Sequence, residues 1–324
     1  MNVERSDPVV SVLVAAKDEA ASLVQLYHEV RTALDAPDPA GHCRDGWELI
    51  LVDDGSTDDS WAIMRSLSAR DGRVRALRLR RNFGKSAALA AGLAASRGDV
   101  IATLDGDLQD DPAEIPEMVR RLFDEEIDMV AGHKFQRRDP LGKRMPSYVF
   151  NAVTSKVTGL TLRDHNCGLK VAQREVYEAL PIYGEMHRFF AAISHANGFV
   201  VVEHPVNHRP RLHGRSKFGL ERYARGGLDL FTVVTLTRYR RRPAHLFGGL
   251  GLLSGVMGLA VLLWLTGVWF FTDEPIGNRP LLLFGVLLVI LAVQLVSLGV
   301  LAELIVTRDA RHDDPDRYVR SRVP

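Results

Sequence analysis

Cysteine is scarce in this sequence, with only 2 among 324 residues. Cys43 and Cys167 lie far apart and form no Cys-x-x-Cys pair, so that they can build neither a zinc site nor a disulfide framework. The chain is therefore expected to work in a reducing compartment. The stretch 1–8 lacks a long apolar run and leads straight into a strand pattern, so no secretory signal is expected there.

An excess of charge of either sign is also lacking. Lys and Arg number 41, and Asp and Glu number 40, which leaves a formal net charge of +1. This balance excludes a basic protein that coats nucleic acid, and no nucleic acid partner is expected. Hydrophobic residues at 46% and charged residues at 25% exclude a disordered chain. Since one domain usually has roughly 100 to 200 residues, two parts are expected.

Two long apolar runs are present, over residues 246–271 and 281–306. Each exceeds the roughly 20 residues that cross a hydrocarbon core, and a polar break at 272–280 separates them. The alternative is an apolar hairpin in the core of a soluble protein. Glu303 is the one acidic residue within the two runs, which favours two tilted transmembrane helices.

The basic residues around these runs predict an orientation. Arginines cluster at 238–242 before the first run and at 308 and 311 after the second, whereas the break contains only Arg279. Cytoplasmic flanks are enriched in Lys and Arg, so both termini are expected on the cytoplasmic side. We therefore expect a multi-pass protein of the inner (plasma) membrane with a cytoplasmic catalytic domain.

Glycines within the first run imitate a dinucleotide-binding motif. Such a motif must follow a strand and begin a soluble helix, which this location does not provide. Small residues in membrane helices allow close approach. Gly251 and Gly255 are thus expected to pack helices together, within one chain or between copies in a homo-oligomer.

Before the membrane segments, apolar β-branched runs alternate with helical patterns. This alternation predicts a mostly parallel α/β sheet, in which ligands bind beyond the carboxyl ends of the strands. The strand runs are 9–15, 49–52, 74–79, 100–104 and 129–131, and the helical patterns are 23–34, 60–67, 86–95 and 112–123.

Asp105, Asp107 and Gln109 follow the fourth predicted strand. Two carboxylates two residues apart, with glycine between them, can surround one hard divalent ion, and the amide supplies a third oxygen. Mg²⁺ or Mn²⁺ would complete its shell with phosphate oxygens, which points to a diphosphate substrate. The alternative is a helix N-cap, a role that we assign to Asp110 or Asp111 before Pro112.

Two further groups of polar residues follow strands. Asp53 and Asp54 end the second strand and could hydrogen-bond a ribose or a base, although Ser56 to Asp59 could simply cap the next helix. Lys85 in Asn82-Phe83-Gly84-Lys85-Ser86 begins a helix and could contact a phosphate or be solvated. A Walker A motif is excluded, because Leu79 stands where it requires glycine.

Together these motifs resemble family 2 glycosyltransferases with the GT-A fold. Ser216-Lys217-Phe218-Gly219 and the two apolar runs are similar to those of polyisoprenyl-phosphate glycosyltransferases, the bacterial relatives of dolichyl-phosphate mannose synthase. The resemblance covers almost the whole chain. One departure is the stretch from Ala15 to Glu19, where relatives usually have Pro-x-Tyr-Asn-Glu.

The resemblance implies a role for each matching position. Asp105 and Asp107 would be catalytic, and with Gln109 they would surround the metal and the diphosphate. The residues implied to bind the nucleotide sugar are Ala15, Lys17, Glu19, Asp53, Asp54, Lys85 and Asp105. Those implied to hold the acceptor phosphate are Lys134, Lys143, Arg144, Arg215, Ser216 and Lys217. The stretch from Asn166 to Lys170 resembles a loop that shapes the sugar pocket.

The basic segment 209–242 independently favours a phosphate acceptor. It contains ten Lys and Arg residues against the two acids Glu221 and Asp229. Such a run is usually a solvated face, but this one adjoins the first apolar run. There the attraction of each Lys or Arg side chain to anionic lipid contributes about 1 kcal/mol to membrane binding. An interfacial helix that contacts lipid is expected.

These observations predict an inverting transferase that moves a hexosyl group from a nucleoside-diphosphate sugar, of UDP-glucose or GDP-mannose type, to polyprenyl phosphate. A phosphate monoester with a second pKa of about 6 is already an anionic nucleophile and needs no strong base. The stretch from Gly184 to Arg188 has no Asp to act as one. The alternatives are a membrane enzyme that extends a saccharide and a catalytically silent nucleotide-binding scaffold. The Gln-x-x-Arg-Trp motif of processive synthases is missing from the sequence.

The expected organisation follows the same order. A GT-A catalytic domain is expected over 1–217 and an interfacial amphipathic region over 218–243. Two transmembrane helices are expected over 244–307 and a cytoplasmic tail over 308–324.

Overall fold

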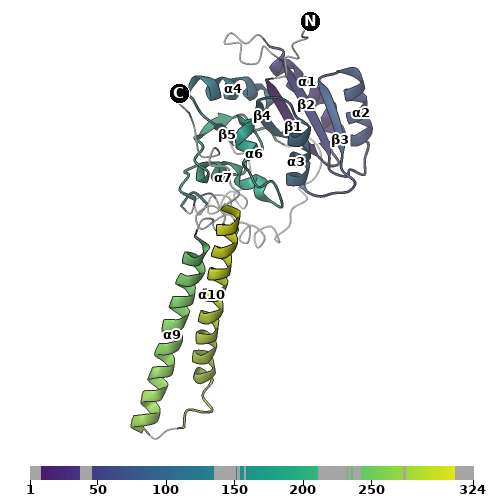
Figure 1. Cartoon of the computed structure of the whole chain (residues 1–324). Helices are drawn as coiled ribbons and strands as arrows, with labels where there is room; N and C mark the ends of the chain where they lie inside the picture. The colour runs from purple at the N-terminus through teal and green to yellow at the C-terminus, as the bar shows by residue number, and fades with distance from the viewer. Residues whose placement is uncertain are drawn as a thin grey trace. The chain divides into compact units, whose positions relative to one another are not determined.

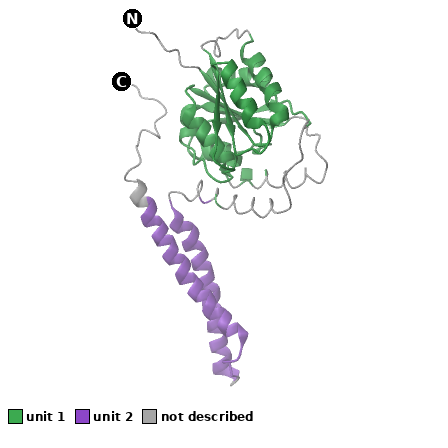
Figure 2. Cartoon of the chain, turned by 90° about the vertical axis from the view of Figure 1, so that its right-hand side faces the viewer, with its two compact units in different colours: residues 1–233 green, residues 234–324 purple. Residues whose placement is uncertain are grey.

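The computed structural model describes residues 9–36, 46–134, 151, 154–156, 158–210, 232, 235, 242–272 and 275–310. The chain divides into two compact units, residues 1–233 and 234–324, which Figure 2 colours green and purple. The domain boundaries expected at 217 and 243 stay predictions.

The first unit contains one seven-stranded sheet in the order β3-β2-β1-β4-β6-β5-β7 (Figure 1). The strands are β1 (Val10–Ala16), β2 (Trp47–Asp53), β3 (Val74–Arg78), β4 (Val100–Asp105), β5 (Met129–Lys134), β6 (Lys170–Gln173) and β7 (Val201–Val206). Only β6 runs antiparallel to its neighbours, between β4 and β5. The mostly parallel sheet predicted from the sequence is confirmed.

Helices follow the strands in the predicted alternation. They are α1 (Ala20–Leu34), α2 (Ser60–Arg70), α3 (Lys85–Ala95), η1 (Pro112–Glu114), α4 (Ile115–Asp124), α6 (Arg174–Glu178), η2 (Met186–Phe189) and α7 (Phe190–Ala196). The four helical segments and five strands that were predicted before residue 134 agree with these bounds to within a few residues. No strand or helix was predicted between residues 132 and 217, where β6, β7, α6, η2 and α7 lie.

Successive side chains of β1 point to opposite faces of the sheet. Val12 and Val14 point into an apolar cluster shared with α1, α2 and α4. Leu13 points the other way, where Gly92 of α3 lies close to it and to Val52 of β2. Because successive side chains of a strand alternate, one strand supplies both cores. The sheet is covered on two faces, so its polar residues gather at the strand ends.

The second unit contains two long apolar helices, α9 (Pro243–Thr272) and α10 (Pro280–Ala310). Residues 243–272 and 280–306 are both long and apolar enough to cross a membrane, and the mean hydropathy of an 18-residue window within them is 2.1 and 2.9. They are candidate membrane spans, as expected from the sequence.

Glycines bring these two helices together. A Cβ on Gly258 would lie 2.8 Å from the carbonyl oxygen of Gly285, and one on Gly251 would lie 2.9 Å from Val296 Cγ2. Gly255 faces Ala292 at 3.2 Å. The predicted packing role of Gly251 and Gly255 is therefore fulfilled within one chain.

The β2–α2 turn depends on one glycine. Gly55 has φ +68°, and a Cβ there would lie 2.6 Å from the backbone of Arg81 and Asn82. We expect Gly55→Ala to lower the thermal unfolding midpoint of the detergent-solubilised chain by about 4 °C or more, since both strain and overlap oppose the folded state. Gly72→Ala is the matched control, because nothing lies within 4 Å of its added Cβ. Equal midpoints for the two variants would contradict this account.

Candidate active site

The carboxyl ends of three adjacent strands meet at one edge of the sheet. In the parallel register of β1 with its neighbours, Ala16 pairs with Asp53 of β2 and Ala15 pairs with Asp105 of β4. Asp53 and Asp105 therefore lie on either side of the end of β1, although they are distant in sequence. This edge is where the sequence placed the ligand site.

The loops after β1 and β2 are hydrogen-bonded to each other. The backbone N–H of Asp18 donates to Ser56 Oγ at 2.9 Å, and that of Thr57 donates to Asp18 Oδ1 at 2.8 Å. The N–H of Glu19 donates to Ser60 Oγ, also at 2.9 Å. Lys17 is half-buried just before this junction. Ser56 thus joins two loops rather than capping α2.

Asp53 is fully buried within the turn that it begins. Its Oδ1 accepts a hydrogen bond from Ser56 N at 2.8 Å, and its Oδ2 lies 3.2 Å from Arg78 Nε. Both oxygens face protein groups, so the geometry gives this carboxylate a structural role. Its contact with a nucleoside stays a prediction.

Asp54 organises the loop before α3. Its two carboxylate oxygens accept hydrogen bonds from Phe83 N at 2.7 Å and Gly84 N at 3.0 Å. Gly84 has φ +93°, a backbone conformation that favours glycine. The Asp-Asp-Gly-Ser motif and the Asn82–Ser86 stretch are therefore one connected structure.

Lys85 begins α3, and its ammonium contacts Oδ1 of Asp105 at the end of β4. The two side chains are 27% and 36% exposed, so water reaches the pair. Burial acts to raise the pKa of Asp105, but the charge and hydrogen bond of Lys85 outweigh it and hold this pKa below its usual range. The carboxylate is ionised at neutral pH.

Asp107 and Gln109 form a tight turn after β4. Oδ1 of Asp107 accepts a hydrogen bond from Gln109 N at 3.2 Å, and Leu108 between them has φ +62°. Asp107 is 8% exposed. The carbonyl of Gln109 accepts a hydrogen bond from Arg209 N at 2.9 Å, which ties this turn to the chain after β7.

Asp110 and Asp111 have different roles. Asp111 accepts a hydrogen bond from Ala113 N at 3.1 Å and caps η1, as one of the two sequence alternatives expected. Asp110 is 1% exposed and faces inward. Its Oδ1 has no hydrogen-bond partner among the described residues and lies 3.8 Å from Nδ1 of His208.

Gly168 lies directly against two carboxylates. A Cβ there would lie 2.6 Å from Asp105 Oδ2 and 2.7 Å from Asp110 Oδ2. The two carboxylates therefore converge on a space that only glycine leaves open. Sequence reasoning gave Gly168 no role of its own and Asp110 only a capping role, because a contact between residues so far apart leaves no local pattern.

This arrangement fits a hard divalent cation. Its donors are carboxylate oxygens, and two of them converge across Gly168. One buried oxygen of Asp110 has no hydrogen-bond partner in the part of the chain that the structure describes. Within the described parts of the chain, no group of three or more His, Cys, Asp or Glu side chains could hold a metal ion. A bound cation would therefore need oxygens from Gln109 and the substrate as well.

Lys134 ends β5 near these acids. Burial acts to lower its pKa, but Asp110 and other nearby negative groups outweigh this effect, and the pKa of Lys134 is raised. A charged ammonium at this position fits the predicted acceptor-phosphate role. The other predicted acceptor residues, Lys143, Arg144, Arg215, Ser216 and Lys217, lie outside the described residues.

Sequence reasoning also missed His187. Its Nδ1 lies 2.9 Å from Oγ of Ser86, which joins η2 to the start of α3. Burial, followed by the charges of Lys85 and Arg188, lowers the pKa of His187 to about 2. The imidazole is neutral and supports the backbone beside Lys85.

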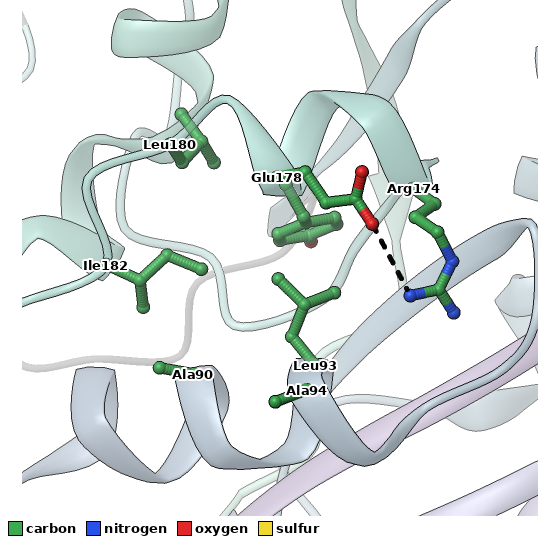
Figure 3. A pocket seen from close by; sticks show the side chains of 8 residues that line it. Ala90, Leu93, Ala94, Arg174, Glu178, Leu180 and Ile182 are labelled. Atoms are coloured by element: carbon green, nitrogen blue, oxygen red, sulfur yellow. Dashed lines mark ion pairs between the residues drawn. The ribbon is translucent and has the colours of Figure 1, made fainter.

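A surface hollow of about 400 Å³ lies apart from these groups, between α3 and α6 (Figure 3). Apolar side chains such as Leu93 and Leu180 line it, together with an ion pair at 3.8 Å between Arg174 and Glu178. None of its lining residues is a predicted site residue. The carboxylates predicted as site residues lie instead at the strand ends.

Comparison with protein families gives the same assignment. The model of the family described as glycosyl transferase family 2 matches residues 11–181. These include β1 from its second residue onward, β2 to β6 and every site carboxylate described above. The chain belongs to this family. The sequence-based recognition is thus confirmed, and the protein is a glycosyltransferase.

Two curated relatives match most of this family 2 chain. Dodecaprenyl-phosphate galacturonate synthase of Rhizobium johnstonii is 41% identical over 279 residues, which is 84% of this chain and 82% of the relative. Undecaprenyl-phosphate 4-deoxy-4-formamido-L-arabinose transferase of Pseudomonas paraeruginosa is 36% identical over 301 residues, which is 91% of this chain and 84% of the relative.

Solved structures show the same fold. Glucosyl-3-phosphoglycerate synthase from Mycobacterium tuberculosis, in complex with Mn²⁺, UDP and glucosyl-3-phosphoglycerate, matches with a TM-score of 0.54 and 20% identity. The match covers 70% of this chain and 79% of that chain. It supports the GT-A-like fold of the first unit.

The close approach of Gly168 generates a prediction. Gly168→Ala should lower glycosyl transfer at least about tenfold, because the added methyl group would displace the carboxylates of Asp105 and Asp110. Initial rates at saturating donor would measure the loss, and Gly72→Ala should retain the parental rate. Full activity of Gly168→Ala would show that the two carboxylates need not converge.

Proposed function

We propose that this chain transfers a glycosyl group from a nucleoside-diphosphate sugar to polyprenyl phosphate at the cytoplasmic face of the inner (plasma) membrane. The observation that carries the proposal is the similarity, over most of both chains, to two relatives named for polyprenyl-phosphate products. The two candidate membrane spans support it, since such an acceptor resides in a bilayer.

The site residues take the following roles. Asp105, Asp107 and Gln109 would hold Mg²⁺ or Mn²⁺, with Asp110 beside them. When bound, the cation neutralises charge that develops on the departing diphosphate. Lys85 would contact the diphosphate, while Glu19 and Asp54 would contact the nucleoside.

The acceptor phosphate would approach from the side on which Lys134 lies. Lys134 and the predicted cations Lys143, Arg144, Arg215 and Lys217 would bind its phosphate. The phosphate oxygen would attack the anomeric carbon in line, form the new glycosyl–oxygen bond and expel the nucleoside diphosphate in one step with inversion. No proton needs to be removed from the nucleophile. This agrees with the strongly lowered pKa of buried His187, which makes it a weak base.

A lipid-product assay tests this function. Membranes that contain the chain would be incubated with polyprenyl phosphate and a labelled donor, and the lipid fraction would be analysed. The donors are UDP-glucose, GDP-mannose and nucleotide-activated forms of the two sugars named in the relatives, galacturonate and 4-deoxy-4-formamido-L-arabinose. A labelled monosaccharide lipid is expected from one donor. A lengthened saccharide with no such lipid would favour the competing function of saccharide extension.

The metal requirement is the third prediction. Asp107→Asn should remove nearly all transfer, because a bound cation stabilises by several kcal/mol the negative charge that develops on the departing diphosphate in the transition state. Asp124→Asn is the matched control, since Asp124 pairs with Arg120 on the exposed face of α4. Turnover that persists in excess chelator, or an Asp107→Asn variant that works like the control, would refute the assignment.

The orientation of the hairpin is the fourth prediction. A cysteine introduced at Asn278, between α9 and α10, should react with an impermeant thiol reagent in intact cells, because the flanking arginines favour the cytoplasm. The parental chain, whose described cysteine Cys167 is buried, is the control. Labelling that requires cell lysis would place this turn inside the cell.

A further inference from the structure

The negative charge of Asp105 is already balanced by a cation before any substrate binds. The carboxylate that the site offers to a cation is in contact with the ammonium of Lys85, from the first residue of α3. Lys85 contacts Oδ1, and the other oxygen, Oδ2, is the one that converges with Asp110 at Gly168. A divalent ion at Oδ2 would share this carboxylate with the ammonium, and the repulsion between the two cations favours release of Lys85 when the ion binds.

The backbone that carries Lys85 is fixed on both sides. Before it, Gly84 N donates to Asp54 at 3.0 Å. After it, Ser86 is 1% exposed and lies against His187. The ammonium can move only on its own side-chain stem, so it stays beside the site when it leaves Asp105.

A released ammonium needs a new anionic partner. The neighbouring Asp107 already accepts a hydrogen bond from Gln109 N, and buried Asp110 faces His208 and the field of Lys134. Separating a partly buried pair without replacing the lost partner is costly. A diphosphate supplies the missing negative charge beside the same loop.

We propose that Lys85 is an exchangeable counterion of Asp105, which opposes binding of a divalent cation alone and favours binding of the cation together with the donor diphosphate. The proposal rests on the proposed donor site but not on the identity of the acceptor. It makes cation and nucleotide binding mutually dependent. The cation displaces Lys85 from Asp105, and the diphosphate gives the released ammonium a new anionic partner. An empty site would then remain electrostatically balanced.

The test is a Mn²⁺ titration of the detergent-solubilised full chain, in which electron paramagnetic resonance counts unbound Mn²⁺. It is run without nucleotide and then with saturating UDP or GDP. Lys85→Met should bind Mn²⁺ about tenfold more tightly than the parent without nucleotide, because its competitor is gone. The enhancement by nucleotide should fall about tenfold in the same variant.

Two controls separate charge from shape. Lys85→Arg keeps a cation beside Asp105 and should bind Mn²⁺ as weakly as the parent does. Arg80→Met removes an exposed cation from the same loop and should change neither affinity. Circular dichroism and thermal unfolding check that each variant is folded.

Several outcomes would overturn the proposal. They are an unchanged or weaker Mn²⁺ affinity of folded Lys85→Met without nucleotide, equal effects of the Met and Arg variants, and no Mn²⁺ binding by any variant even with nucleotide. A Lys85→Met variant too unstable to measure would be replaced by Lys85→Gln, with the same expected direction. Because the titration contains no acceptor lipid, failure of the lipid-product assay would leave this result standing.

Discussion

The register between β1 and its two parallel neighbours is the constraint on which this site depends. Because Ala15 pairs with Asp105 and Ala16 with Asp53, the turns after β2 and β4 begin at the same level of the sheet. A slip of one residue would turn Asp105 to the other face of the sheet. The apolar cores on both faces prevent such a slip, so the packing of Val12 and Leu13 also positions the polar chemistry.

The loops at this edge hold one another through their polar side chains. Asp18 connects the turn after β1 to the turn after β2, and Asp54 connects that turn to the start of α3. α3 then places Lys85 against Asp105. Side chains that could contact a ligand thus accept hydrogen bonds from backbone N–H groups, which would be costly to leave unpaired in these half-buried loops. The site is organised before a substrate binds.

The parts of the molecule that the sequence predicted are those with local signals. Strand periodicity located β1 to β5. The two acids before Pro112 predicted a cap at Asp110 or Asp111, and the structure shows that Asp111 caps η1. Long apolar runs located α9 and α10. Each of these features depends on neighbours within a few residues, which a pattern can record.

Features that depend on distant contacts were not predictable in this way. β6 is a four-residue strand whose place between β4 and β5 follows from tertiary pairing. Its position brings Gly168 against Asp105, and no spacing in the sequence encodes that approach. The contact between His187 and Ser86 likewise joins residues 101 positions apart. A ligand role for Asp54 was inferred from its motif, while its hydrogen bonds to the α3 loop became apparent only in the fold.

Charge balance connects these observations. Asp105 and Asp110 are brought together at Gly168. Repulsion between the two carboxylates would destabilise this edge of the sheet unless cations lay near them. Lys85 contacts Asp105. Burial acts to lower the pKa of Lys134, but several nearby negative groups, with Asp110 first among them, together raise it. A divalent ion must therefore enter a site that already has positive charge. A diphosphate that binds with the ion restores the balance, because its negative charges can pair with the displaced ammonium of Lys85. The internal counterions of this sheet edge would thereby also favour binding of the metal together with the nucleotide.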